Sequence, residues 1–178
     1  MKNVLIISST PRKNGNSERL CQEFRKGAQE AGHQVELVCL RDLEIGYCRG
    51  CFACAELGRC VIDDDMQELA QKVRQADVLV LATPVYFYSM SGQLKVFIDR
   101  LVPVYEQVRA EIYLFCTAAD SNIPSLAPTL EAIRGLTRDC FEDCEEKYSL
   151  AVGEVNEIGD IEGKSEALTL AYNMGLDC

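Results

Sequence analysis

The feature that most constrains the fold is an apolar run in the middle of the chain. From Asp77 to Thr83 the sequence reads Asp-Val-Leu-Val-Leu-Ala-Thr, and every position from Val78 to Ala82 is apolar. A strand with one face in water alternates apolar and polar residues, whereas a strand that is covered on both faces does not. We therefore expect a central strand of a parallel sheet, with helices on both faces.

Strand-like and helix-like segments alternate along the rest of the chain. We expect further strands at residues 4–8, 34–40, 111–118 and 148–155, and helices at residues 16–31, from 63 onward, 91–101, 126–145 and 164–174, the last ended by Gly175. The helix from residue 63 is opened by three aspartates, whose carboxylates suit the positive end of a helix dipole. Five strands alternating with helices in 178 residues predict a single domain, residues 1–178, with a doubly wound three-layer α/β fold.

Two strand orders fit this pattern, the flavodoxin-like order 2-1-3-4-5 and the order of the dinucleotide-binding fold. In both, ligands bind beyond the carboxyl ends of the strands, at the point where the strand order reverses. The Gly-x-Gly-x-x-Gly sequence of the dinucleotide-binding fold is absent after the first strand. We therefore expect a five-stranded parallel sheet of order 2-1-3-4-5, with the ligand at the loops that follow Ser8 and Thr83.

The first of these loops has the residues of an anion site. From Ser8 to Ser17 it reads Ser-Ser-Thr-Pro-Arg-Lys-Asn-Gly-Asn-Ser, with several hydroxyls, two cations and the start of a helix. Hydroxyls, arginine and the free N–H groups of a helix N-terminus all bind phosphate well. Such a local device is needed because the formal net charge of −10 repels anions. The alternative is a polar turn in which Asn16 or Ser17 caps the helix.

The second loop, from Thr83 to Gly92, carries three consecutive aromatic residues, Tyr86, Phe87 and Tyr88, before small polar ones. Aromatic side chains and backbone donors at a strand exit suit a planar, partly apolar ring. Packing of these aromatics against a helix or another subunit is the alternative. Together the two loops predict a phosphate at one edge of a single cleft and a ring at the other, as in FMN.

Several short sequences resemble the NAD(P)H-dependent FMN reductase family and its iron–sulfur flavoprotein branch, over most of the chain. They are Ser9-Thr10-Pro11-Arg12, Gly15-Asn16-Ser17, Thr83-Pro84-Val85-Tyr86, Gly92-Gln93-Leu94-Lys95 and Asp99-Arg100. Residues 102–109 depart from the family pattern, so the fourth strand is the hardest to place. The resemblance implies bound FMN, NAD(P)H as a donor, and a homodimer or homotetramer.

The resemblance also implies which residues contact FMN. Ser9, Arg12, Gly15, Asn16 and Ser17 would hold the phosphate, in a binding loop that also includes Thr10, Pro11 and Asn14. The isoalloxazine ring would be lined by Pro84, Val85, Tyr86, Phe87, Tyr88 and Ser89, and a third flavin loop would be formed by Thr117, Ala118, Ala119 and Asp120.

A compact group of cysteines lies in the segment at residues 46–62. The chain has 10 cysteines, and four of them follow the spacing Cys48-x₂-Cys51-x₂-Cys54-x₅-Cys60. Overlapping short spacings favour an iron–sulfur cluster over zinc, which more often uses two separated pairs. The resemblance implies that these four bind a [4Fe–4S] cluster; zinc, redox-active thiols or an inert loop are the alternatives. Cys140 and Cys144 are expected on one face of a helix.

The sequence thus predicts an FMN-dependent oxidoreductase that transfers electrons between a reduced donor and an acceptor through FMN and a [4Fe–4S] cluster. The donor or acceptor could be NAD(P)H, a ferredoxin-like protein or a quinone, and no side chain stands out as an acid–base catalyst. Two alternatives are an NAD(P)H-dependent FMN or quinone reductase without a cluster, and a flavodoxin-like electron carrier. The acidic charge argues against nucleic-acid binding. The lack of a signal-peptide pattern or a long apolar run predicts a cytoplasmic protein that does not cross a membrane.

Overall fold

The computed structural model describes every residue from Met1 to Cys178. Its strands are β1 (Asn3–Ser8), β2 (Gln34–Cys39), β3 (Val78–Pro84), β4 (Glu111–Thr117) and β5 (Glu145–Val152). Its helices are α1 (Asn16–Glu30), α2 (Ala53–Leu57), α3 (Met66–Gln75), α4 (Gly92–Asp99), α5 (Ala127–Thr137) and α6 (Ser165–Leu176). Short 3₁₀ turns lie at Leu40–Asp42, Tyr105–Gln107, Ile123–Leu126 and Asp160–Gly163.

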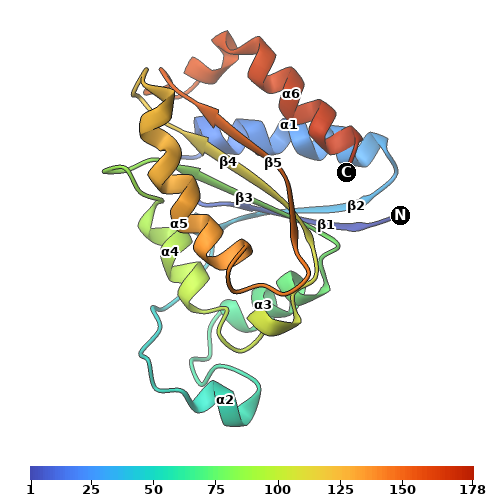
Figure 1. Ribbon diagram of the computed structural model, residues 1–178, viewed down its shortest axis with the longest axis vertical. Coiled ribbons are helices and arrows are strands. Elements are labelled where there is room, and N and C mark those ends of the chain that lie inside the picture. The colour runs from blue at the N-terminus through green and yellow to red at the C-terminus, as the bar shows by residue number, and fades with distance from the viewer.

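The five strands form one parallel sheet of order β2-β1-β3-β4-β5. Strands that follow one another in the chain are connected by crossovers that contain a helix, and the crossover from β2 to β3 passes β1 (Figure 1). The predicted fold and strand order are confirmed, including the fourth strand. Because all strands run in one direction, their carboxyl ends, and the loops that follow them, lie at one edge of the sheet.

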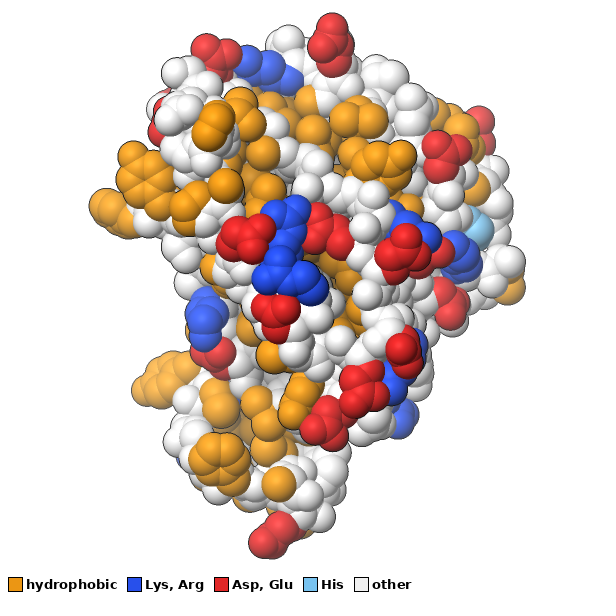
Figure 2. All heavy atoms as spheres, in the orientation of Figure 1, with side chains coloured by type: hydrophobic (Ala, Val, Ile, Leu, Met, Phe, Trp, Pro, Cys, Tyr) orange, Lys and Arg blue, Asp and Glu red, His pale blue; other side chains and the backbone are white.

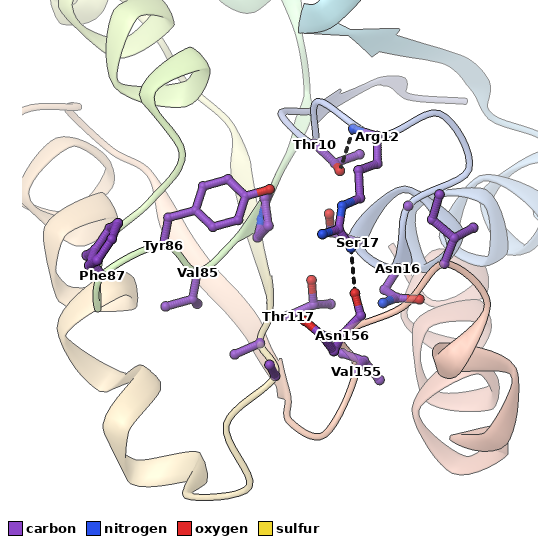
Figure 3. Close-up of a pocket in the computed structure, with 15 residues that line it drawn as sticks. Thr10, Arg12, Asn16, Ser17, Val85, Tyr86, Phe87, Thr117, Val155 and Asn156 are labelled. Carbon is purple, nitrogen blue, oxygen red and sulfur yellow. Dashed lines mark hydrogen bonds between the residues drawn. The ribbon is translucent and has the colours of Figure 1, made fainter.

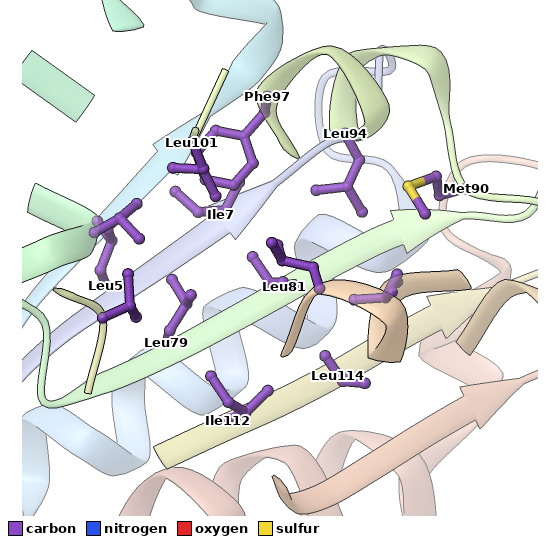
Figure 4. Close-up of a cluster of buried hydrophobic side chains, with 14 of the residues drawn as sticks. Leu5, Ile7, Leu79, Leu81, Met90, Leu94, Phe97, Leu101, Ile112 and Leu114 are labelled. Atoms are coloured by element: carbon purple, nitrogen blue, oxygen red, sulfur yellow. The ribbon is translucent and has the colours of Figure 1, made fainter. Parts of the chain in front are cut away.

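The central strand β3 is buried on both faces, as its apolar run predicts. Leu79 and Leu81 face a core that they share with α3, α4 and α5 (Figure 4). Val78 and Val80, the alternate residues, face a second core under α1 and α6. The sheet is therefore the middle of three layers, and period-2 alternation sends successive apolar side chains into different cores.

Helices α1 and α6 approach each other closely because each has a glycine at the contact. A Cβ atom built on Gly175 would lie 2.0 Å from the carbonyl oxygen of Phe24, and one built on Gly27 would lie 2.0 Å from that of Tyr172. The prediction that Gly175 ends the last helix is wrong, because α6 continues to Leu176. Gly175 is there to let two helix backbones meet.

The predicted helix at residues 126–145 is also wrong at its C-terminal end. Helix α5 ends at Thr137, where the N–H groups of Cys140 and Phe141 turn back to the carbonyl of Leu136. Strand β5 then begins at Glu145, which pairs with Glu111, and ends at Val152 rather than at residue 155. The charged start of β5 resembles a helix surface in sequence, but as part of an edge strand it can face water.

Because the predicted helix at residues 126–145 extended too far, the predicted positions of two cysteines are also wrong. Cys140 is exposed in the turn after α5, and Cys144 lies directly before β5, where its Sγ accepts a hydrogen bond from the N–H of Ala110 at 3.3 Å. These two thiols therefore do not share a helix face.

The cysteine-rich segment projects from the body of the molecule below α3 and α4 (Figure 1). It contains the single-turn helix α2, and left-handed backbone occurs at Gly50, Phe52 and Gly58. Hydrophobic side chains gather on this lobe (Figure 2), and Tyr47 and Phe52 are both exposed. None of the helices has the length and apolar character that are needed to cross a lipid bilayer.

Candidate functional site

The loops after β1 and β3 meet at one cleft, as the sequence predicts. The cleft has a volume of about 320 Å³, and both Arg12 and Tyr86 line it (Figure 3). The full lining consists of Thr10, Arg12, Gly15, Asn16, Ser17, Pro84, Val85, Tyr86, Phe87, Thr117, Ala118, Ala119, Val155, Asn156 and Ile158.

One side of the cleft is formed by the N-terminus of α1. No side chain caps this helix, so its first N–H groups are free to bind a ligand. The hydroxyl of Ser17 is buried and has no hydrogen-bond partner within the protein. Unsatisfied buried hydroxyls are rare in proteins, and one beside a helix N-terminus indicates a site for an anion. A phosphate group fits this side of the cleft.

Gly15 allows the binding loop to fold tightly against this helix end. A Cβ atom at position 15 would lie 2.6 Å from Oγ1 of Thr10 and 3.1 Å from the carbonyl oxygen of Arg12. The N–H of Gly15 also donates to that carbonyl at 3.1 Å. Any side chain here would push the loop away from the first turn of α1.

Arg12 supplies a cation at the same place. Its Nη1 donates to the carbonyl oxygen of Asn156 at 2.5 Å, and its backbone N–H donates to Oγ1 of Thr10 at 3.3 Å. The side chain points into the cleft beside Ser17 (Figure 3). Because one contact holds the guanidinium in place, its remaining N–H groups can bind an anion.

The opposite side of the cleft is a strained turn. The N–H groups of Tyr86 and Ser89 each donate to the other's carbonyl oxygen, at 2.9 and 3.0 Å. The two residues between them, Phe87 and Tyr88, have φ angles of 51° and 60°, which bulky side chains rarely adopt. Tyr86 points across the cleft, whereas Phe87 points away and is fully exposed (Figure 3). Strain of this kind concentrates at functional sites.

The floor of the cleft comes from the loops after β4 and β5. The N–H of Val85 donates to the carbonyl of Thr117 at 2.8 Å, and that of Val155 donates to the carbonyl of Ala118 at 3.0 Å. Asn16 joins the loop after β5 to the phosphate side by donating from Nδ2 to the carbonyl of Glu157 at 3.0 Å. The loops after four of the five strands, β1, β3, β4 and β5, thus contribute to one site with a polar side and an apolar side.

A family model described as NADPH-dependent FMN reductase matches residues 2–131. The chain belongs to the NADPH-dependent FMN reductase family. Residues matched by that model include the loops after β1, β3 and β4, so most of the cleft lies within the family region.

Individual proteins show the same relationship. The chain is 42% identical over 103 residues to an iron–sulfur flavoprotein of Archaeoglobus fulgidus. This match covers 58% of this chain and 46% of that protein. It is also 41% identical over 101 residues to an iron–sulfur flavoprotein of Methanocaldococcus jannaschii. This match covers 57% of this chain and 52% of that protein. The match therefore spans about half the length of these relatives. An NAD(P)H:quinone oxidoreductase from Methanothermobacter marburgensis superposes with a TM-score of 0.78 over 99% of this chain and 96% of that one, at 17% identity.

Some residues expected to contact FMN do not line the cleft of this family member. Ser9 is buried between the loops, where its Oγ donates to the carbonyl of Ala82 at 2.9 Å and accepts from Oγ of Ser91 at 2.9 Å. It therefore ties the loop after β1 to β3 and to the start of α4. Also outside the lining are Pro11, Asn14, Tyr88, Ser89 and Asp120. Asp120 instead accepts from the N–H of Asn122 and the hydroxyl of Ser125, which lower its pKa.

Three lining residues were not identified from the sequence: Val155, Asn156 and Ile158. The fifth strand was expected to continue to residue 155, which placed the loop too far along the chain. The sequence could have indicated these residues, because the loop after any parallel strand in this sheet lies at the edge where the ligand binds.

The four cysteines at positions 48, 51, 54 and 60 line a second hollow of about 430 Å³. Apolar residues, including Ile62, Ile98 and Val102, supply most of the remaining wall. All four thiols are free, and no group of three or more potential ligands is close enough together to form a metal site. The donor chemistry fits an iron–sulfur cluster, but the segment would have to close around it.

A buried ion pair supports the phosphate side of the cleft. Glu18, in the first turn of α1, accepts from the N–H of Asn14 at 2.9 Å and from both terminal nitrogens of Arg41 at 2.9 and 3.2 Å. Burial lowers the pKa of Arg41, but its bonds to Glu18 and nearby acidic groups raise it above the ordinary value. Arg41 thereby neutralises a carboxylate that would otherwise repel an anion at Ser17.

Replacing Arg41 with alanine should weaken FMN binding about tenfold and lower the melting temperature, because it leaves Glu18 buried without a counterion beside the anion site. Fluorescence titration with FMN and a thermal melt measure both effects. The double variant E18Q/R41A should recover most of the affinity, since glutamine carries no charge. If R41A and E18Q/R41A lost the same amount of FMN affinity, the proposed role of Arg41 in neutralising Glu18 would be contradicted.

Proposed function

We propose that this chain is an FMN-dependent oxidoreductase that transfers electrons between a reduced donor and an acceptor. The observation that carries the proposal is the single cleft in which a phosphate site and an aromatic, apolar surface face each other. Its volume of about 320 Å³ lies within the usual range of sites for small organic ligands, roughly 300–1,000 Å³.

The protein's own residues would bind and orient the cofactor. Ser17, Arg12 and the N-terminus of α1 would hold the phosphate, while Tyr86 and Val85 would cover one side of the ring. Bound FMN supplies both one-electron and two-electron chemistry. No cleft-lining side chain is a carboxylate, histidine or cysteine, so the chain contributes binding and orientation rather than acid–base catalysis.

NAD(P)H is the proposed electron donor, and a quinone, a free flavin or a redox protein is the proposed acceptor. Family membership and the quinone oxidoreductase with the same fold support this assignment. We further propose a homodimer or homotetramer. Phe87 is fully exposed beside the cleft, and a subunit contact would cover it.

We also propose that Cys48, Cys51, Cys54 and Cys60 hold a [4Fe–4S] cluster in the native protein. Support comes from the apolar hollow that all four thiols line and from the iron–sulfur flavoproteins among the relatives. A cluster held by these cysteines would supply one-electron chemistry.

A second candidate is an NAD(P)H-dependent reductase that binds FMN without a cluster. The open arrangement of the four thiols favours this candidate, because no three ligands converge. The two candidates share the FMN cleft and differ only in the cysteine-rich segment.

Anaerobic purification, followed by a visible spectrum and assays for iron and sulfide, distinguishes these candidates. We expect flavin absorption and about four iron atoms per chain, with iron lost in C51S and kept in C140S, which alters an exposed thiol outside the segment. Flavin without iron would select the cluster-free reductase, and FMN that is not reduced by NAD(P)H would indicate a carrier. A protein that does not take up added FMN would contradict all three.

A further inference from the structure

The loop that follows β5 is bonded to the N-terminus of α1, and residues 155–161 of this loop are called the strap below. Asn16, the first residue of α1, holds the strap with both polar atoms of its side chain. Its Nδ2 donates to the carbonyl of Glu157 at 3.0 Å, and its Oδ1 accepts from the N–H of Ile161 at 3.3 Å. Asn16 is only 8% exposed. Its side chain therefore holds the strap, although the family resemblance implies a contact with the phosphate.

Two further residues fix the strap, one inside the cleft and one outside it. Inside, Nη1 of Arg12 donates to the carbonyl of Asn156 at 2.5 Å (Figure 3). Outside, the carboxylate of Asp160 accepts from the N–H groups of Asn156 and Glu157, at 2.9 and 2.8 Å. Asp160 is exposed and does not line the cleft. The turn of the strap is thus held by two side chains of the phosphate side and by one carboxylate that no bound ligand would touch.

The strap presents acceptors and negative charge to the anion site. Its two carbonyl oxygens that accept from Asn16 and Arg12 point toward the phosphate side. Four carboxylates lie in the strap or directly beside it, at Glu154, Glu157, Asp160 and Glu162. Those of Glu154 and Glu162 are paired with Lys164 and Arg19, whereas those of Glu157 and Asp160 have no cationic partner. Arg12 and the N-terminus of α1 can balance one phosphate, but a second phosphate would meet carbonyl oxygens and unpaired carboxylates.

We propose that Asn16 is a positioning residue for the strap, and that the strap makes the cleft specific for a flavin that ends in a single phosphate and rejects flavin adenine dinucleotide (FAD). This inference rests on the proposed FMN site. FAD extends FMN by a second phosphate and an adenosine, and the extension begins at the phosphate that faces the strap. Its binding would require the strap to move. Specificity of this kind comes from unfavourable contacts with the wrong ligand.

The size of the cleft agrees with this inference. Its volume of about 320 Å³ lies at the lower end of the usual range for small-ligand sites, roughly 300–1,000 Å³. The hydroxyl of Ser17 and the free N–H groups of α1 provide one anion site, and none of the four carboxylates at the strap lines the cleft beside it. The cleft thus has room and donors for one phosphate only.

The test is calorimetric titration of the flavin-free protein with FMN and with FAD, for the wild type, N16A, D160A and E162A. We expect the wild type to bind FMN at least about 100-fold more tightly than FAD, and N16A and D160A each to lower this ratio to about tenfold or less. E162A is the matched control, because it removes a neighbouring carboxylate whose partner is Arg19 and which makes no bond to the strap. Its ratio should equal that of the wild type.

A direct contact between Asn16 and the phosphate predicts a different pattern. N16A would then weaken FMN and FAD equally, and D160A would change neither. Hydrogen exchange provides a second readout, since the amide of Ile161 should exchange faster in N16A while the amides of the central strand β3 stay protected.

An unchanged ratio in N16A and D160A, or an equal fall in E162A, would overturn the inference. If N16A does not fold, D160A decides: a lower ratio supports the role of the strap, and an unchanged ratio overturns it. A wild-type protein that binds FMN and FAD equally well would contradict this inference alone. A wild-type protein that binds neither flavin would contradict the proposed FMN site as well.

Discussion

Replacing Gly175 with alanine is expected to lower the free energy of unfolding by about 3 kcal/mol, because the new methyl group overpacks a contact between two helix backbones. The Cβ would lie 2.0 Å from the carbonyl oxygen of Phe24 and 2.9 Å from the backbone nitrogen of Ala28, and neither atom can move without shifting α1. Alanine's better helix propensity would offset this loss by no more than about 1 kcal/mol. For a chain of this size, a melting temperature lower by roughly 10 °C follows.

The matched control is Gly135→Ala. Gly135 lies inside α5, and nothing is within 4 Å of a Cβ built there, so the same substitution should stabilise the protein by up to about 1 kcal/mol. Gly27→Ala should behave like Gly175→Ala, because its Cβ would lie 2.0 Å from the carbonyl of Tyr172. Thermal and urea unfolding measure all three. Similar melting temperatures for G175A and G135A would contradict the close packing of α1 on α6.

Arg12→Ala should weaken FMN binding about 30-fold, which corresponds to ~2 kcal/mol, because it removes charge-assisted hydrogen bonds to the phosphate. The affinity for riboflavin, which has no phosphate, should not change. Lys13→Ala is the control, since Lys13 is an adjacent cation that does not line the cleft. It should reduce the affinity by less than about threefold, through the weak and screened effect of an exposed charge. An equal loss in R12A and K13A would show that only the overall charge of the loop matters.

Much of the fold could be predicted because the decisive signals are local. The apolar run of β3 requires cover on both faces, and the missing glycine fingerprint after β1 favours the observed strand order. The end of α5 was not predictable in this way. Residues 145–147 are charged and helix-compatible, and they become strand because Glu145 pairs with Glu111, a contact between distant parts of the chain.

Prediction of the site from the sequence is limited in the same way, by contacts between distant parts of the chain. The residue types at Arg12, Ser17 and Tyr86 indicated an anion and a ring, and the structure brings all three to one cleft. Ser9 has equally suitable chemistry, but its hydroxyl is used to join the two loops. Asp64 was interpreted as a helix-dipole carboxylate, and it does accept from the N–H of Met66, but its main partner is Arg100. That pairing depends on packing between α4 and the segment before α3, which no local pattern reveals.

The central claim is that the α1 side of the cleft binds a phosphate while the Tyr86 side shelters a ring. Titration of the flavin-free wild-type protein with FMN and with riboflavin, followed by flavin fluorescence, tests it directly. The account predicts that FMN binds at least about 100-fold more tightly than riboflavin, a difference of ~2.7 kcal/mol supplied by the phosphate contacts. Equal affinities for the two flavins, or no binding of either, would contradict it.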